Sequence, residues 1–434
     1  MGAVSAITDA AATSLFTLSL EQACADVGRV SSVLLIPPDS TRFHSRAGFF
    51  TGIAWRVLSE KGIAVTILPA LGTHVPLSAA ERERMFPGVP ESRFRIHDWR
   101  NDVAEIARIE REWVEHVTCG AVSYDWPVQV NKMLQSGGFD LIVSLGQVVP
   151  HEVIGMANHA KNLFVGTGGK EAIDKSHFAG AVYGMERIMG RTDTPVRALF
   201  DEGFRRSEGK IPPVFFALTV VSADLCLRGL FCGFGRACFE QAAALSRQLN
   251  VDLLDEPVRK AVVYLDPAEF RTTWLGNKAV YRTRMAMASP SGEGAQGELV
   301  IIAPGLERFG EDAGIDALIR QYGYRPAAVI REKVAAHAEL ANNLSAAAHL
   351  IHGSSEGRFT VRYCPGPGLS RQEIESVGFA WGDITEAMAR YDIRRLAAGW
   401  NTGADGSSSG EDGRFFYVPN PALGLWALRS NFTE

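Results

Sequence analysis

Cysteine is scarce in this sequence and is never paired at short spacing. Six cysteines are scattered over 434 residues, with no CxxC motif. That is too few for a disulfide scaffold in a chain of this length, and the spacing does not suit a zinc or iron–sulfur site built from four cysteines. Such cysteine use is typical of a reducing compartment, so we expect a cytoplasmic protein.

Long apolar runs and a large net charge are also missing. The sequence has no apolar run of about 18 residues, the length needed to cross a bilayer, and residues 1–20 lack the basic start of a secretory signal. We therefore expect no membrane association and no secretion. The 44 Lys and Arg residues against 49 Asp and Glu residues leave a net charge of −5. This balance gives no electrostatic reason to expect nucleic acid as a partner.

An ordinary globular composition remains, with 46% hydrophobic and 21% charged residues. Short apolar segments alternate with helical patterns along the chain, which predicts an α/β fold with mainly parallel sheets. We expect two α/β domains, 1–258 and 259–434, with an active-site cleft between them. Strands are predicted at 33–36, 63–68, 140–145, 214–221, 261–265 and 298–303, and helices at 48–61, 101–116 and 330–349.

Chemically versatile side chains follow the first two predicted strands. In open α/β sheets, ligands bind beyond the carboxyl ends of the strands. Asp39, Thr41, Arg42 and His44 follow the first strand; Asp can accept from ribose hydroxyls, and Arg can bind a carboxylate or phosphate through two contacts. The same segment could instead cap the next helix. His74 follows the second strand, where it could act as an acid or base or lie at the surface.

The segment after the third strand contains the densest set of such residues. His151, His159, Lys161 and His177 occur there, together with a glycine-rich stretch at 166–169. Imidazole suits nickel, zinc or copper, a lysine amine can bond to a carbonyl-type group, and glycine-loop amides can face a phosphate. Surface or capping positions are expected for the remaining groups, which are His97, His116, His337, His349, His352, Arg205, Arg206, Arg282 and Arg284.

These motifs, in this order, resemble the nickel-dependent lactate racemase family. The segment PDSTR at 38–42 resembles the family's PDxTR signature, and His74 in GTH resembles the GxH element with one catalytic histidine. His151, Lys161 and His177 resemble the second catalytic histidine, the cofactor-bearing lysine and the nickel-ligand histidine. The resemblance covers most of the chain in length and order.

The resemblance implies a racemase or epimerase that inverts C2 of a 2-hydroxy acid. Its cofactor would be a nickel-pincer nucleotide, a pyridinium bisthiocarboxylic acid mononucleotide with nickel, made by separate cofactor-synthesis proteins. Lys161 would hold the nucleotide as a thioamide, and His177 would bind nickel. While hydride passes from C2 to the cofactor and returns on the other face, His74 and His151 would exchange the hydroxyl proton on opposite sides.

The resemblance also suggests binding roles in both domains. Asp39, Thr41 and Arg42 would bind the cofactor, with Asp39 contacting the ribose or orienting Arg42. Arg42 and Lys278 are the candidates for the substrate carboxylate or for the cofactor phosphate, and Lys278 lies in a stretch that resembles one in the family's C-terminal domain. The N-terminal domain would therefore bind the cofactor, and the C-terminal domain would close the cleft.

Departures from the family's pattern bear on the substrate. The segment MANH at 156–159 stands in place of the usual glycine- and serine-rich run before the lysine, and Trp274 and Leu275 replace a tyrosine and a glutamine. Asn158 and His159 could hydrogen-bond a polyhydroxylated substrate or only support the site. We expect a larger 2-hydroxy acid, such as an aldonic sugar acid, with lactate or another short acid as the alternative.

Two other functions remain open on the sequence. A zinc-type hydrolase would bind one metal ion through His74, His151 and His177 together. A non-catalytic homologue would bind a nucleotide or metal and leave Lys161 unmodified.

Overall fold

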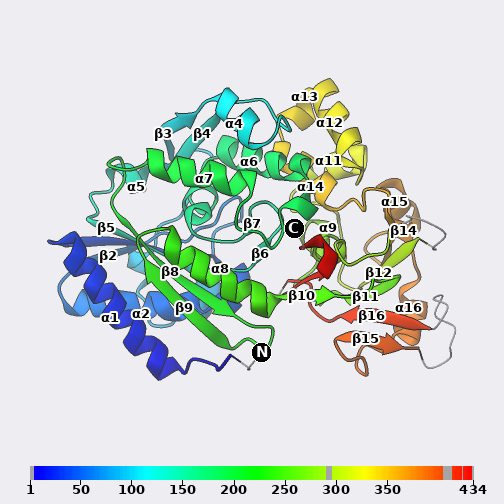
Figure 1. Ribbon diagram of the computed structural model, residues 1–434, viewed down its shortest axis with the longest axis horizontal. Helices are drawn as coiled ribbons and strands as arrows, with labels where there is room; N and C mark the ends of the chain where they lie inside the picture. The colour runs from blue at the N-terminus through cyan, green and yellow to red at the C-terminus, as the bar shows by residue number, and fades with distance from the viewer. Residues whose placement is uncertain (1–3, 290–295, 404–412, 423, 433–434) are drawn as a thin grey trace. The chain divides into compact units, whose positions relative to one another are not determined.

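A computed structural model describes residues 4–289, 296–403, 413–422 and 424–432. The chain separates into two compact units, of which the first comprises Met1–Ala179 and Ile188–Asn250. The second unit comprises Gly180–Arg187 and Val251–Glu434. Each unit contains helices and a largely parallel sheet (Figure 1), so the predicted α/β fold is confirmed. The predicted cleft between the domains stays a prediction.

The first unit is built on a five-stranded sheet with the order β2-β1-β5-β8-β9. Neighbouring strands are parallel except for the antiparallel β8–β9 pair. The strands are β1 (Ser32–Ile36), β2 (Ala64–Ile67), β5 (Leu141–Gln147), β8 (Val214–Val221) and β9 (Leu227–Gly233). Every residue of β5 and β8 is buried, as expected for parallel strands covered on both faces. The four strands predicted in this unit are confirmed.

Helices α1 (Asp9–Val27) and α2 (Ala47–Glu60) share one core with the sheet. Phe16 of α1 and Phe50 of α2 are buried there with their rings 5.1 Å apart. Burying such a side chain stabilises the fold by roughly 1.5–3 kcal/mol. Because α2 covers nearly the same residues, the helix predicted at 48–61 is confirmed.

Shorter elements complete the first unit. They are η1 (Ser40–Ser45), α3 (Ala79–Met85), η2 (Glu91–Arg93), β3 (Val103–Ile109), α4 (Arg111–Val117), β4 (Trp126–Asn131), α5 (Lys132–Ser136), β6 (Pro150–His151), β7 (Gly155–Met156), the π-helical turn η3 (Asn162–Gly166), α7 (Pro195–Arg206) and α8 (Arg236–Asn250). Helix α6 (Lys170–Tyr183) begins in the first unit and ends in the second. β3 pairs with β4 and β6 pairs with β7, both antiparallel.

The prediction of a helix at 101–116 is wrong. This segment forms strand β3 and then enters the short helix α4. The register of β3 shifts between Glu105 and Ala107, so Ile106 is an extra residue in the ladder. A bulge breaks the alternation of a strand, and it allows Ile106 and Ile109 both to be buried. Their spacing of three imitates the period of a helix.

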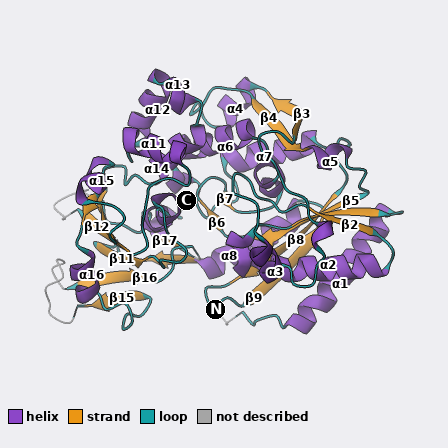
Figure 2. Ribbon diagram, turned by 180° about the vertical axis from the view of Figure 1, so that it is seen from behind, coloured by secondary structure: helices purple, strands orange, loops and turns teal. Residues whose placement is uncertain are grey.

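The second unit contains a six-stranded sheet with the order β14-β13-β12-β11-β16-β15. Figure 2 labels β12, β11, β16 and β15 of this sheet. Only the β15–β16 pair is antiparallel. The strands are β11 (Lys260–Tyr264), β12 (Gly297–Ala303), β13 (Phe359–Pro365), β14 (Ala380–Trp381), β15 (Gly399–Thr402) and β16 (Arg414–Val418), and β10 (Val251–Leu254) pairs with β17 (Leu425–Leu428). The strands predicted at 261–265 and 298–303 are confirmed as β11 and β12.

The single helix predicted at 330–349 is wrong in its continuity. The chain forms α12 (Ala327–Ala336), α13 (Ala338–Ala341) and α14 (Leu344–His352) instead. His337 has extended backbone angles, and Asn343 also leaves the helical region. The other helices of this unit are η4 (Met185–Arg187), α9 (Thr273–Gly276), α10 (Lys278–Thr283), α11 (Ala313–Tyr322), α15 (Arg371–Ser376), α16 (Ile384–Arg390) and η5 (Arg429–Asn431).

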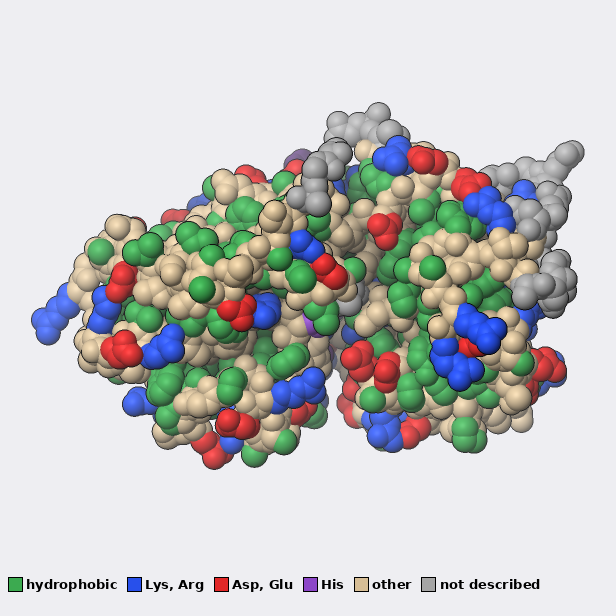
Figure 3. Space-filling model, turned by 90° about the horizontal axis from the view of Figure 1, so that it is seen from below, with side chains coloured by type: hydrophobic (Ala, Val, Ile, Leu, Met, Phe, Trp, Pro, Cys, Tyr) green, Lys and Arg blue, Asp and Glu red, His purple; other side chains and the backbone are tan. Residues whose placement is uncertain are grey.

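Acidic and basic side chains are interspersed on the face drawn in Figure 3, with apolar side chains between them. This mixture agrees with the small net charge. Within the described ranges, no helix combines the length and apolarity needed to cross a bilayer.

Candidate functional site

Loops after three neighbouring strands of the first unit bring together most of the predicted site residues. The loop after β2 joins the η3 turn, because the Gly72 amide donates to the carbonyl of Gly166 at 2.9 Å. The Asn162 side chain donates to the carbonyl of Ile36 at 3.0 Å and to the Ser144 hydroxyl at 2.9 Å. These bonds connect the π-helical turn after Lys161 to the carboxyl end of β1 and to the middle of β5.

Gly166 is required for this close approach. A Cβ atom at this position would lie 2.6 Å from the Cβ of Ala70. The amide groups of Thr167, Gly168 and Lys170 donate to carbonyls within the protein. The glycines at 166–169 therefore serve packing, and these three amides are not directed at a phosphate.

The carboxylate of Asp39 binds the ring of His74. Asp39 is buried, accepts from the Thr41 amide and hydroxyl, and lies 2.5 Å from His74 Nδ1. Neutral His74 then carries its proton on Nδ1 and leaves Nε2 as an acceptor. Burial raises the pKa of Asp39, but the hydrogen bond and charge of His74, together with Arg42, bring that pKa below its usual value. Asp39 therefore stays ionised and orients His74, a role that the sequence did not indicate.

Thr41 and Arg42 lie on η1 beside this pair. The Arg42 guanidinium donates to the Thr41 hydroxyl at 3.2 Å. Asp39 caps η1 through its bond to the Thr41 amide, whereas α2 begins after Arg46, whose side chain makes no capping bond. Asp39 thus caps the short helix of this loop as well as binding His74.

Lys161 is the point at which separate motifs meet. Burial lowers the pKa of Lys161 to about 8, the Arg42 charge lowers it too, and Glu152 and Asp39 act in the opposite direction. An amine with such a pKa is partly neutral near pH 7 and can act as a nucleophile.

His177 lies on α6 with one ring nitrogen committed to the backbone. Its Nδ1 donates to the carbonyl of Ile173 at 2.8 Å, one turn earlier, which leaves the Nε2 lone pair for a ligand. Burial lowers the pKa of His177, and the charge of Lys161 adds to this effect. His177 is therefore a neutral imidazole, the form that binds metal ions.

Nowhere in the described part of the chain do three His, Cys, Asp or Glu side chains converge as a metal site. His74, His151 and His177 are not gathered as ligands of one ion, so the geometry does not support the zinc-type hydrolase. Nickel attached through His177 alone would take its other ligands from a cofactor, and the neutral His177 and reactive Lys161 fit that arrangement.

His151 lies on the β6–β7 hairpin and is buried. Its Nδ1 accepts from the Val153 amide at 3.1 Å, and a Glu152 carboxylate oxygen lies 3.7 Å from the same nitrogen. Glu152 also favours the charged forms of Lys161 and His177. The sequence motifs did not indicate Glu152, although its position directly after His151 was a visible signal.

A strained turn precedes Lys161. Asn158 and His159 have φ angles of 70° and 60°, in the left-handed region that favours glycine. The buried Arg197 guanidinium donates to the carbonyl of Met156 at 2.5 Å and to that of Asn158 at 3.3 Å. Arg197 is a second residue that the motifs did not indicate, and it fixes the backbone leading to Lys161.

The ring of His159 is packed among aromatic side chains. Its centroid lies 4.1 Å from that of Phe216, and Phe204 and Phe239 also contact it. Burial lowers the pKa of His159 to about 3, and the Arg197 charge lowers it too. The ring of His159 therefore packs in the core. Because it is buried among aromatic rings, it is not placed to hydrogen-bond a sugar-like substrate.

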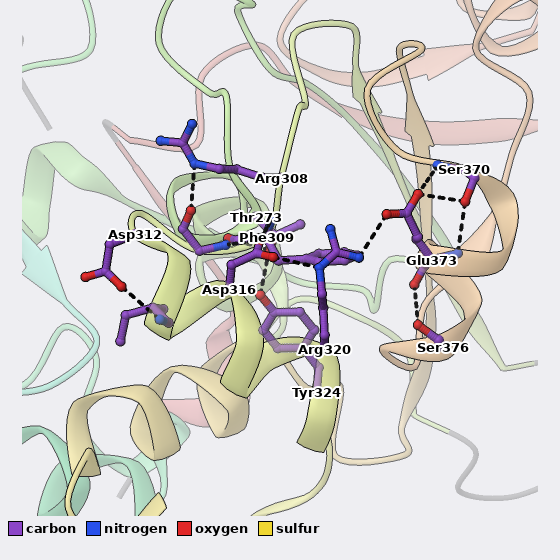
Figure 4. Close-up of polar contacts among 12 residues, drawn as sticks. Thr273, Arg308, Phe309, Asp312, Asp316, Arg320, Tyr324, Ser370, Glu373 and Ser376 are labelled. Atoms are coloured by element: carbon purple, nitrogen blue, oxygen red, sulfur yellow. Dashed lines mark hydrogen bonds and ion pairs between the residues drawn. The ribbon is translucent and has the colours of Figure 1, made fainter. Parts of the chain in front are cut away.

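Lys278 belongs to the second unit, where it begins α10 directly after α9. Its ammonium lies 5.7 Å from the ring centroid of Phe270. Thr273 fixes this segment, because its hydroxyl donates to the carbonyl of Phe309 at 3.0 Å and bonds the Tyr324 hydroxyl at 2.6 Å (Figure 4). Trp274 stacks on His349 with centroids 4.1 Å apart.

Several groups expected at the surface are buried instead. His97 bonds the Gly168 carbonyl at 3.0 Å, and Arg284 pairs with Glu186 at 2.7 Å. In both cases the buried polar side chain has a partner that is distant in the sequence. Helical patterns in a sequence do not reveal such partners. The residues concerned are His97, His349, His352, Arg282 and Arg284.

Comparisons with known proteins give a matching family model and several similar solved structures. Residues 10–188 match the family model described as the lactate racemase N-terminal domain. A search of curated proteins gives no match. A crystal structure of a Thermotoga maritima protein superposes with a TM-score of 0.79 at 23% identity, covering 98% of this chain and 99% of that one. The lactate racemase apoprotein from Thermoanaerobacterium thermosaccharolyticum gives 0.72 at 14% identity, covering 95% and 92%. At these identities the two structures establish the fold alone.

Proposed function

Because residues 10–188 match the model of the lactate racemase N-terminal domain, we propose that this protein is a racemase or epimerase that inverts C2 of a 2-hydroxy acid. The observation that supports this most strongly is that the separate motifs meet around Lys161. The turn that follows Lys161 is bonded to the end of β1 through Asn162 and to the loop after β2 through Gly72, and Asp39 and His74 of those loops are bonded to each other.

Two residues would hold the nickel-pincer nucleotide. Lys161 supplies the amine for the thioamide link, and His177 offers Nε2 to nickel because its Nδ1 is bound to the carbonyl of Ile173. Thr41 and Arg42 are the proposed contacts for the rest of the nucleotide. When bound, the nucleotide supplies a centre that takes and returns a hydride at C2.

The protein's own contribution is to move and hold the hydroxyl proton of the substrate. Inversion of a carbon requires an acid or base on each face, and His74 and His151 are the proposed pair. Asp39 keeps the Nδ1 proton of His74 in place, so that Nε2 faces the reaction as a base. Arg42 and Lys278 are the proposed partners of the substrate carboxylate.

We propose a larger 2-hydroxy acid, of the aldonic type, as the substrate. Trp274 and Leu275 stand where the resemblance leads us to expect a tyrosine and a glutamine. The indole of Trp274 stacks on His349 of the same unit, which fixes its orientation. The packing of His159 removes one argument for this preference, so the proposal rests on Trp274 and Leu275.

An inversion assay on the loaded enzyme tests this function. The protein is co-expressed with pincer-synthesis enzymes and nickel, and 2-hydroxy acids from lactate to gluconate are analysed by chiral chromatography. We expect inversion by the wild type and by His116→Ala, a control on α4. His74→Ala and His151→Ala should each lose activity in both directions. Normal interconversion by either variant would remove that residue from the pair.

A further inference from the structure

Each proposed acid–base histidine has a carboxylate near Nδ1, but the two arrangements differ. Asp39 lies 2.5 Å from Nδ1 of His74, whereas Glu152 lies 3.7 Å from Nδ1 of His151. The second distance is beyond a hydrogen bond. Instead, the amide of Val153 donates to Nδ1 of His151 at 3.1 Å.

The Val153 contact determines which tautomer His151 adopts. A ring nitrogen that accepts an amide proton has no proton of its own, so neutral His151 carries its proton on Nε2. In that form Nε2 cannot accept a proton from a substrate. To act as a base through Nε2, His151 must move its ring proton to Nδ1, where an acceptor is needed.

Glu152 is the acceptor that the structure offers. Glu152 lies in the turn between β6 and β7. Its carboxylate would compete with the neighbouring Val153 amide for Nδ1 of His151. Its oxygen must move by roughly 1 Å to reach hydrogen-bond distance of Nδ1. The side chain is only 19% exposed, and its charge also acts on Lys161 and His177. Glu152 therefore faces the candidate site rather than bulk solvent.

We propose that Glu152 is a positioning residue that accepts the Nδ1 proton of His151 and thereby makes Nε2 of this ring a base. Glu152 would do for His151 what Asp39 does for His74. The role in turnover rests on the proposed function, whereas the control of the tautomer does not.

The tautomer can be measured without cofactor or substrate. Isotope-labelled histidine and a long-range proton–nitrogen correlation spectrum distinguish Nδ1–H from Nε2–H, and His151→Gln assigns the signals. We expect wild-type His151 to populate Nδ1–H, with Glu152 as its acceptor, alongside the Nε2–H form that the Val153 contact favours. Glu152→Gln should leave the Nε2–H form alone, and Glu105→Gln, which removes a surface carboxylate paired with Arg108, should match the wild type. Glu152→Asp keeps the charge and should retain more Nδ1–H than Glu152→Gln. Identical His151 signals in the wild type and Glu152→Gln, or equal loss in both Glu152 variants, would overturn the proposal.

Kinetics of the loaded enzyme separate this proposal from the proposed function. Glu152→Gln should lower kcat by about 100-fold with little change in KM, because a proton-transfer step is impaired rather than binding. A raised KM with unchanged kcat would overturn the positioning role. If the wild type inverts no 2-hydroxy acid while Glu152→Gln still changes the His151 tautomer, the proposed function fails and the pairing stands.

Discussion

At the scale of single residues, the charge of Asp39 controls the proton on His74. The carboxylate is buried, ionised and in contact with Nδ1. We expect Asp39→Asn to lower kcat by about 100-fold, because an uncharged amide no longer stabilises the protonated ring during transfer. Steady-state kinetics of the loaded enzyme measure this effect, with Asp26→Asn on the exposed side of α1 as the control. Equal kcat for Asp39→Asn and the control would contradict the role.

His177 is expected to hold nickel, whereas the organic part of the cofactor is expected to be held by Lys161 without it. Its Nε2 is the ring nitrogen left for a metal after Nδ1 bonds the carbonyl of Ile173. His177→Ala should therefore lose nickel and keep the adduct on Lys161. Metal analysis and peptide mass measured on the same sample give both quantities, and an unchanged nickel content would reject His177 as the ligand.

His159 should make the fold sensitive to acid. Its pKa is about 3 in the folded chain, against an ordinary value of about 6.5 in the unfolded chain. Between these values the unfolded state takes up a proton and the folded state does not. The contribution to stability is therefore complete above the unfolded pKa and falls by about 1.4 kcal/mol per pH unit as the pH drops towards the folded pKa.

The variant His159→Phe tests this sign, because a phenyl ring suits the cage of Phe204, Phe216 and Phe239 and does not titrate. Urea unfolding gives the free energy of unfolding at pH 7 and at pH 5. Between these values the wild type should lose roughly 2 kcal/mol more of this free energy than His159→Phe does. The same pH dependence in both proteins would show that His159 takes up its proton in the folded state.

At the scale of elements, helix α7 fixes the strained turn before Lys161 through Arg197. Its guanidinium donates to the carbonyls of Met156 and Asn158. Arg197→Met should lower the free energy of unfolding by about 3 kcal/mol, because two buried carbonyls lose a charged donor. Urea unfolding measures this loss, with Arg205→Met on the same helix as an exposed control. Equal stability of the two variants would contradict this role for Arg197.

Sequence patterns identified elements where local signals were sufficient. β1, β5 and β8 are short apolar runs and were predicted near their observed bounds. The pattern failed where a bulge at Ile106 changed the period of β3, and where Asn343 interrupted a helical stretch. Both failures arise from backbone geometry that hydrophobic spacing does not encode.

The candidate site was also predicted only in part, because local motifs are visible in a sequence and tertiary contacts are not. His74, His151 and Lys161 follow strand ends, so their motifs were visible in order along the chain. Glu152 and Arg197 acquire their roles from tertiary contacts, as does the bond between Asp39 and His74, and no spacing along the chain indicates those contacts.

At the scale of the whole molecule, the parallel order of the first sheet explains why distant motifs meet. β2, β1 and β5 are neighbours and parallel, so the loops after them leave the same edge. Lys278 belongs to the second unit on short helices of its own. The central claim therefore depends on the chemistry at Lys161 in the first unit.

The most direct test of this claim is the mass of the intact protein and of its peptides after co-expression with the pincer-synthesis enzymes. The account predicts an added mass on the peptide that contains Lys161, absent from Lys161→Ala and present in Lys170→Ala, whose lysine lies on α6 and pairs with Asp174. Absence of added mass under conditions that load a known lactate racemase would contradict it, as would an adduct that persists on Lys161→Ala.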